Sequence, residues 1–225
     1  MKNQIKVMRE SRIGLFGGTF NPVHSGHLRA AAIVQKRFSL DKVLFIPSYI
    51  PPHKESYDIA SPVHRLRMIE LAIASFPRFI PSSLEIEAEG KSYSIITLNK
   101  IRKIYPRTLI FFILGIDAFL EIETWKDYEL VLQKCFFIVM SRPNYDLEGV
   151  KSTLSENFSN GICRLSEFEQ IDEDKLSSFK IFLMPIKALD IASTEVRKKV
   201  RKGNSVTDLI PEEVNAYIRE NKLYM

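Results

Sequence analysis

The chain has 225 residues, 45% hydrophobic and 26% charged, which is the balance of a globular protein and excludes a fibrous or disordered one. Its formal net charge of +5 is a modest excess that suits anionic small molecules and gives no ground for a nucleic-acid surface. Two cysteines are too few for a disulfide framework and no apolar run reaches membrane-spanning length, so we expect a single cytoplasmic domain over residues 1–225 without a membrane partner.

Short apolar runs alternate with helical patterns along the chain. Buried strands are expected at residues 13–16, 43–46, 109–114, 136–140 and 181–184. Helices are expected to begin near Gly26, Ser61, Ser94, Trp125 and Thr194, with a closing helix over residues 211–217. The alternation predicts an α/β fold, a doubly wound parallel sheet with a small C-terminal helical part over about residues 193–225. Irregular structure is expected at residues 47–60, 144–178 and 203–211.

The most informative stretch joins the first expected strand to the first expected helix. Residues 17–27 read Gly-Gly-Thr-Phe-Asn-Pro-Val-His-Ser-Gly-His. The paired glycines let the backbone approach a ligand closely, and Thr19 adds a hydroxyl beside amides that could hold an anion. His24 and His27 lie at the start of a helix, whose positively polarised end attracts phosphate. A glycine pair alone would suit an ordinary turn with surface histidines; two histidines at this spacing favour a phosphate site.

The same stretch indicates which class of nucleotide protein to expect. It is neither the Walker pattern nor the three-glycine dinucleotide fingerprint, which disfavours a kinase or a dehydrogenase. It resembles the Gly-Gly-Thr-Phe-x-Pro-x-His-x-Gly-His signature of nicotinate-nucleotide adenylyltransferases, within the HxGH nucleotidyltransferase superfamily. The resemblance implies a Rossmann-like nucleotidyltransferase fold and transfer of AMP from ATP to nicotinate mononucleotide. The products would be nicotinate adenine dinucleotide, in NAD biosynthesis, and pyrophosphate.

Two further segments resemble phosphate-binding motifs of this family. Residues 191–197, Ile-Ala-Ser-Thr-Glu-Val-Arg, are similar to its Ile-Ser-Ser-Thr-x-Ile-Arg motif, which implies that the arginine lies beside the pyrophosphate. Without the resemblance, Ser193 or Thr194 would suit a simple N-cap of the following helix. Residues 50–54, Ile-Pro-Pro-His-Lys, resemble the family's Pro-Pro-His-Lys loop and imply a lysine facing phosphate, although alone they would suit a rigid proline loop.

Other segments resemble the mononucleotide-binding motifs of the family. Residues 92–98 are similar to its Ser-Tyr-Thr-x-Asp-Thr-Leu segment, whose backbone amides hold the pyridine carboxylate, but Ile96 replaces the aspartate. Trp125 matches the tryptophan that stacks on the nicotinate ring, and Lys126 replaces the tyrosine that commonly follows it. Residues 141–144 are similar to the family's Arg-Pro-Gly, with asparagine in the glycine position. The resemblance runs from residue 13 to 224, and about residues 147–178 lack clear counterparts.

The resemblance implies two sets of binding residues and one catalytic set. The expected ATP-binding residues are Gly17, Gly18, Thr19, Phe20, His24, Gly26, His27, Gly115, Asp117, Ser193, Thr194 and Arg197. The expected mononucleotide-binding residues are Gly18, Lys54, Ser94, Trp125, Lys126 and Arg142. The expected catalytic residues, which would neutralise the triphosphate, are His24, His27, Lys54 and Arg197. No protein metal ligand is expected, because Mg²⁺ would be delivered with ATP.

Two alternative functions stay open from the sequence. Another HxGH transferase would share the phosphate site and accept nicotinamide mononucleotide or pantetheine phosphate instead. A nucleotide-binding regulator would keep the phosphate site without turnover. The sequence also leaves open a homo-oligomer.

Overall fold

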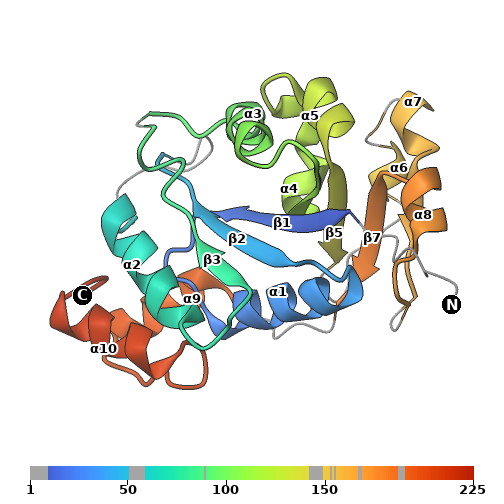
Figure 1. Ribbon diagram of the computed structural model, residues 1–225. Coiled ribbons are helices and arrows are strands. Elements are labelled where there is room, and N and C mark those ends of the chain that lie inside the picture. Colours follow the sequence, from blue (N-terminus) through green and yellow to red (C-terminus); the bar gives the residue numbers. More distant parts are fainter. Residues whose placement is uncertain are drawn as a thin grey trace, which may run out of the picture.

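The fold is built on one seven-stranded parallel sheet with the order β3-β2-β1-β4-β5-β7-β6 (Figure 1). The computed structural model describes residues 10–50, 59–88, 90–141, 149–152, 154, 156–166, 169–186 and 191–225. The strands are β1 (Ser11–Gly18), β2 (Lys42–Pro47), β3 (Phe79–Pro81), β4 (Thr108–Gly115), β5 (Phe136–Ser141), β6 (Ile162–Arg164) and β7 (Ile181–Pro185). The α/β class and the five predicted strands are confirmed.

Helices cover both faces of this sheet (Figure 1). Those of the first half are α1 (Ser25–Arg37), α2 (Pro62–Ile73), α3 (Ser94–Ile104) and α4 (Ile116–Leu120). The others are the 3₁₀ helix η2 (Ile122–Thr124), α5 (Tyr128–Lys134), α6 (Gly149–Ser152), α7 (Glu156–Ser159), α8 (Glu173–Ser178), α9 (Ser193–Arg201) and α10 (Glu212–Glu220). None of the helices in the described residues combines the length and the apolar character needed to cross a membrane.

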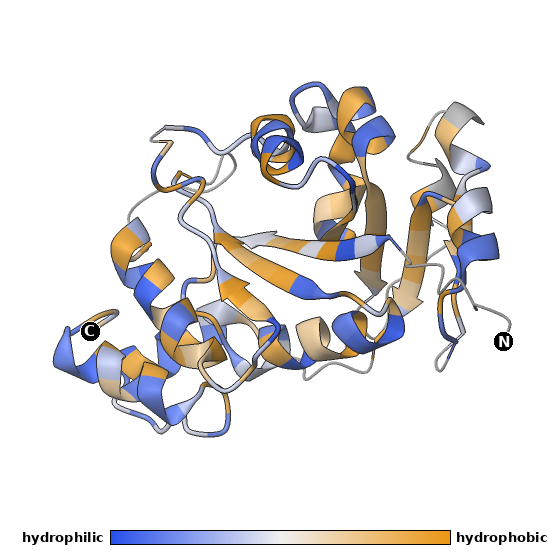
Figure 2. Ribbon diagram, in the orientation of Figure 1, coloured by the Kyte–Doolittle hydropathy of each residue, from blue (hydrophilic) through white to orange (hydrophobic). Residues whose placement is uncertain are grey.

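The core is divided by the sheet into two hydrophobic clusters. Phe16 and Phe45 point to the side of α1, α2, α9 and α10, whereas Leu15 and Leu44 belong to the cluster on the side of α3, α4 and α5. This alternation follows from the two-residue period of a strand, and burial on both faces explains why the strands are apolar throughout. Figure 2 shows mostly apolar strands and helices with polar outer sides. The predicted doubly wound arrangement is therefore confirmed.

Two details of the predicted elements are wrong. The edge strands β3 and β6 were not predicted, because three residues are too few to produce a recognisable alternation. Residues 144–178, expected to be irregular, contain α6, α7, β6 and α8 in their described parts, each with no more than six residues. Residues 203–211 form turns and coil as expected, and α10 begins after Pro211. Most of the expected irregular stretch at 47–60 lies outside the described residues.

Candidate active site

Several predicted ATP-binding residues lie at the carboxyl ends of β1 and β4. The chain leaves β1 for β2 on one side and later returns to place β4 on the other side of β1, so the strand order reverses between these two strands. In open α/β sheets such a reversal leaves a crevice beyond the strand ends, where ligands bind. Gly17 and Gly18 end β1, and Gly115 ends β4 and precedes Asp117 in the first turn of α4. Four predicted ATP-binding residues therefore lie at the strand ends where this rule expects a ligand.

His24 and His27 form a stacked pair at the start of α1. Their ring centroids are 3.6 Å apart with an interplanar angle of 23°. The His24 Nδ1 accepts the backbone N–H of His27, and the His27 Nδ1 accepts the backbone N–H of His24, both at 3.3 Å. A neutral imidazole that accepts at Nδ1 carries its proton on Nε2. The reciprocal cap therefore fixes the tautomer of both rings and makes each Nε2–H a hydrogen-bond donor.

The helix N-terminus offers fewer amides than the sequence analysis expected. The N–H of His27 is used by His24, and the N–H of Ser25 donates to the Leu209 carbonyl at 2.9 Å. These two donors of the first turn are satisfied within the protein and are not available to an anion. Gly26, a predicted ATP-binding residue that lies between the two histidines in sequence, is buried. The two imidazoles therefore add side-chain donors at an end of α1 where two of the amides are already used.

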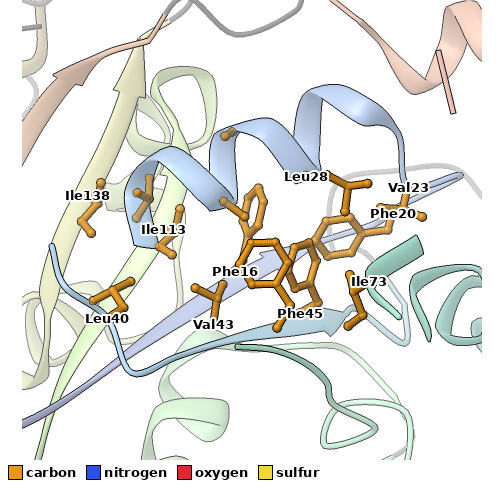
Figure 3. Packing of buried hydrophobic residues seen from close by; sticks show 14 of the residues in the cluster. Phe16, Phe20, Val23, Leu28, Leu40, Val43, Phe45, Ile73, Ile113 and Ile138 are labelled. Atoms are coloured by element: carbon orange, nitrogen blue, oxygen red, sulfur yellow. The ribbon is translucent and has the colours of Figure 1, made fainter. Parts of the chain in front are cut away.

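The loop after β1 buries one residue that was expected to bind ATP. Phe20 is 3% exposed, and its ring lies 5.5 Å from Phe16 and 5.8 Å from Phe45 (Figure 3). Its ring also contacts His27 edge-on, with centroids 5.0 Å apart. A φ of 48° turns the chain sharply at this residue. Its side chain therefore supports the His27 ring from the core side, and only its backbone could contact a nucleotide. Its neighbour Thr19 is half-buried in the same loop.

Helix α9 brings two predicted residues to the same loop. The Ser193 hydroxyl donates to the Pro22 carbonyl, and the Arg197 Nη1 donates to the Asn21 carbonyl, each at 2.9 Å. The expected side-chain cap by Ser193 or Thr194 is wrong, because Ala192 is the N-cap and makes no side-chain hydrogen bond. Burial lowers the pKa of Arg197, and the nearby Tyr224 opposes this shift. Arg197 thus lies next to the loop that precedes His24, and one of its nitrogens is hydrogen-bonded to that loop.

Arg65 is a site residue that the sequence analysis missed. Its side chain is 0% exposed and donates to three backbone carbonyls: Ala60 at 2.9 Å, Thr19 at 2.8 Å and Tyr49 at 3.0 Å. It therefore joins the loop after β1 to the segments on either side of residues 51–58. Burial lowers its pKa to about 10, so the side chain stays charged at neutral pH.

The sequence does contain a signal for Arg65. Along α2 the buried residues include Arg65, Met68, Ile69 and Ala72. An arginine at a helical spacing from three apolar residues falls on the face that packs against the core, where a charge must find partners. Such a position could have been recognised as a buried guanidinium, although not which carbonyls it would bind.

Three of the six predicted mononucleotide-binding residues lie near the start of α3. Ser94 is the first residue of α3, and Tyr93 before it lies under the Lys126 ammonium, 5.1 Å from the ring centroid. Trp125 is half-buried, with its ring edge-on to Phe112 at 5.6 Å. Three of the predicted residues thus share one region. Lys54 and Arg142 lie outside the described residues.

A cavity of about 240 Å³ lies beside this region and contains a carboxylate that the sequence analysis missed. Its lining includes Glu85, Ser92, Tyr93 and Thr97. The Thr97 hydroxyl donates to Glu85 at 2.6 Å, and the Ser92 hydroxyl accepts the Tyr49 N–H at 2.9 Å. Burial raises the pKa of Glu85, and its hydrogen bonds from Thr97 and Ser92 oppose the shift. The cavity wall is therefore tied to the end of β2.

The class of protein follows from a comparison with protein families. A family model described as Cytidylyltransferase-like matches residues 15–199. The matched region includes β1 from Leu15 onward, the histidine pair and α9 up to Lys199, so the fold and the site define a nucleotidyltransferase.

Two relatives identify the family within this class of nucleotidyltransferases. A probable nicotinate-nucleotide adenylyltransferase of Desulfatibacillum aliphaticivorans is 40% identical over 221 residues, covering 95% of this chain and 100% of that protein. A protein of the same name from Moorella thermoacetica is 38% identical over 219 residues, covering 97% and 94%. The chain belongs to the nicotinate-nucleotide adenylyltransferase family, which confirms the resemblance read from the sequence.

Two solved structures have the same fold as this chain. The nicotinic acid mononucleotide adenylyltransferase of Plasmodium falciparum, complexed with NaAD, matches with a TM-score of 0.70 at 21% identity, covering 95% of this chain and 97% of that one. A putative nicotinate-nucleotide adenylyltransferase from Vibrio parahaemolyticus matches with a TM-score of 0.62 at 18% identity, covering 95% of both chains. The predicted Rossmann-like nucleotidyltransferase fold is confirmed.

Proposed function

We propose that this enzyme transfers the AMP part of ATP to nicotinate mononucleotide, with the triphosphate of ATP bound against His24 and His27. The observation that carries the proposal is the reciprocal cap of these two residues. Because each Nδ1 is occupied by a backbone N–H, each ring can donate only through Nε2. Two parallel donors at the positive end of α1, beyond the carboxyl end of β1, suit the oxygens of a polyphosphate.

The reaction needs no nucleophile from the protein. The phosphate oxygen of the mononucleotide attacks the α-phosphorus of ATP, the new P–O bond forms, and the bond to the bridging oxygen of pyrophosphate breaks. The protein therefore has to align the two substrates and to stabilise the negative charge on the oxygens of the transferred phosphoryl group and of the leaving group. His27 would act closest to the transferred phosphorus, while Arg197 and Lys54 would act on the rest of the triphosphate.

Magnesium is proposed to reach the site bound to ATP. The described residues hold no group of three His, Cys, Asp or Glu side chains that could bind a metal ion, so phosphate oxygens and water would supply most of its ligands. When bound, the ion would neutralise part of the charge on the departing pyrophosphate. Asp117, in the first turn of α4, is the carboxylate closest in sequence to the β4 end of the crevice.

The acceptor site is proposed to lie between the start of α3 and Trp125. A half-buried indole can stack on the nicotinate ring, and Ser94 begins a helix whose N-cap residue, Tyr93, makes no side-chain capping hydrogen bond. Lys126 would add a positive charge close to the carboxylate of the base. These features suit the acid better than the amide.

The test compares two histidine variants. Replacing His27 with alanine removes one donor to the transition state, which typically costs about 2–4 kcal/mol, so kcat should fall about 30- to 1000-fold. Replacing His64 with alanine removes a histidine that bonds Tyr217 between α2 and α10 and should leave kcat within about twofold. Dinucleotide and pyrophosphate are measured with ATP and either nicotinate or nicotinamide mononucleotide. Near-normal turnover of His27→Ala would remove His27 from the mechanism, and a folded wild-type enzyme that makes no dinucleotide would refute the function.

A further inference from the structure

The C-terminal end of the chain reaches the loop that follows β1. The hydroxyl of Tyr224, the penultimate residue, donates to the Oδ1 of Asn21 at 2.7 Å, across 203 positions of sequence. The tail leaves α10 through a turn in which the Leu223 N–H bonds the Ile218 carbonyl. Leu223 and Tyr224 then pack against the hydrophobic cluster that contains α1. Figure 1 shows the C-terminus beyond α10, on the side of α2.

Asn21 is the point where several elements meet under this loop. It is 4% exposed, and its Oδ1 accepts a second hydrogen bond from the Ala60 N–H at 3.0 Å. Its own carbonyl accepts from Arg197 in α9 at 2.9 Å. Tyr224 lies close enough to Arg65 and Arg197 for their charges to act on its phenol. The tail therefore belongs to the same polar network as the buried Arg65 and the half-buried Arg197.

The network also reaches the histidine pair. Asn21 directly follows Phe20, whose ring contacts His27 edge-on at 5.0 Å. Three residues further on, His24 stacks on His27 and caps α1. A displacement of Asn21 would therefore shift Phe20 and His24, two side chains that contact the His27 ring. Burial raises the pKa of Tyr224 well above its usual value, so its proton stays in place to donate over the whole neutral range.

We infer that Tyr224 is a positioning residue for the nucleotide site, because its hydroxyl fixes Asn21 and through it Phe20, His24 and His27. The inference rests on the proposed function in one respect, that ATP binds at the histidine pair. Tyr224 lies outside all of the sequence motifs described above. The C-terminal tail thus takes part in shaping the loop of residues 17–27.

A matched pair of tyrosine variants tests the inference. Tyr224→Phe and Tyr217→Phe each remove one phenol hydroxyl from the C-terminal segment, but the Tyr217 hydroxyl bonds His64 at 2.8 Å, between α10 and α2. Tyr224→Phe should lower kcat/KM for ATP about tenfold, with KM for the mononucleotide within about twofold of wild type. Tyr217→Phe should change neither by more than about twofold, and the two variants should have similar thermal midpoints. Equal effects of the two variants on kcat/KM for ATP would overturn the inference.

A double-mutant cycle checks the route through Asn21. Asn21→Ala removes the acceptor, so adding Tyr224→Phe should cause less than about a twofold further loss of kcat/KM for ATP. Asn21→Asp keeps an Oδ1 acceptor and should leave Tyr224→Phe with its own loss of about tenfold. If Tyr224→Phe still lowered kcat/KM for ATP about tenfold in the Asn21→Ala background, Tyr224 would not act through its bond to Asn21.

A third measurement does not depend on the reaction. Without ligand, amide hydrogen exchange of residues 19–27 should quicken about tenfold in Tyr224→Phe relative to Tyr217→Phe, because the loop loses one of its fixed points. Unchanged exchange would refute the inference whatever the enzyme catalyses. If wild type forms no dinucleotide but exchange responds as expected, the proposed function fails and the positioning of the loop stands.

Discussion

Replacing Arg65 with methionine should strongly destabilise the protein. The side chain is 0% exposed and satisfies three carbonyls that belong to three separate segments. Leaving each carbonyl without its donor costs about 1 kcal/mol or more, because buried acceptors have no water to replace the lost bond. Methionine avoids the cost of burying a charge, which offsets part of this loss. We expect the free energy of unfolding to fall by about 3–5 kcal/mol.

Urea denaturation followed by circular dichroism measures this change. With an m value of about 3 kcal/mol/M, the midpoint should fall by about 1–2 M. Arg67→Met, on the same helix, breaks only an exposed ion pair with Glu70 at 2.8 Å and should stay within about 0.5 kcal/mol of wild type. Arg65→Lys keeps the charge but has fewer N–H donors, so its urea midpoint should lie between those of Arg65→Met and Arg67→Met. Equal midpoints for Arg65→Met and Arg67→Met would refute the reasoning.

The remaining predictions concern packing and charge. Gly14→Ala should lower the free energy of unfolding by about 1–3 kcal/mol, since the new Cβ would lie 2.7 Å from the Ile113 Cδ1; an unchanged melting temperature would contradict this. Glu85→Gln should stabilise the protein increasingly as the pH rises from about 4 to 7. Because the folded pKa of Glu85 is raised, the native state holds its proton longer than the unfolded chain, and wild-type stability declines above the usual glutamate value. A pH-independent difference between Glu85→Gln and wild type would show that this carboxyl does not titrate as described.

The sequence was sufficient for the elements with a long, regular pattern. The central strands are buried on both faces, so their continuous apolar runs could be recognised, and the helices between them show apolar spacing. The histidine pair could be placed at the start of α1 because Gly17, Gly18 and the apolar helix after His27 set the boundary of the strand and the helix.

Tertiary contacts decided what the sequence could not predict. The occupied N–H of Ser25 in α1 depends on the carbonyl of Leu209, which is distant in sequence, and the hydroxyl of Ser193 bonds Pro22 rather than capping its own helix. The roles of Arg65 and Tyr224 likewise depend on which distant carbonyls and amides the fold brings to them. Such partners are set by the packing of the whole sheet, and no local pattern carries them.

The most direct measurement of the central claim is a crystal structure of the protein with a non-hydrolysable ATP analogue. We predict that oxygens of the polyphosphate lie within about 3 Å of the Nε2 atoms of His24 and His27, with the Nδ1 atoms still bonded to the backbone. A polyphosphate bound elsewhere, or rings turned so that Nε2 faces away from it, would contradict the account.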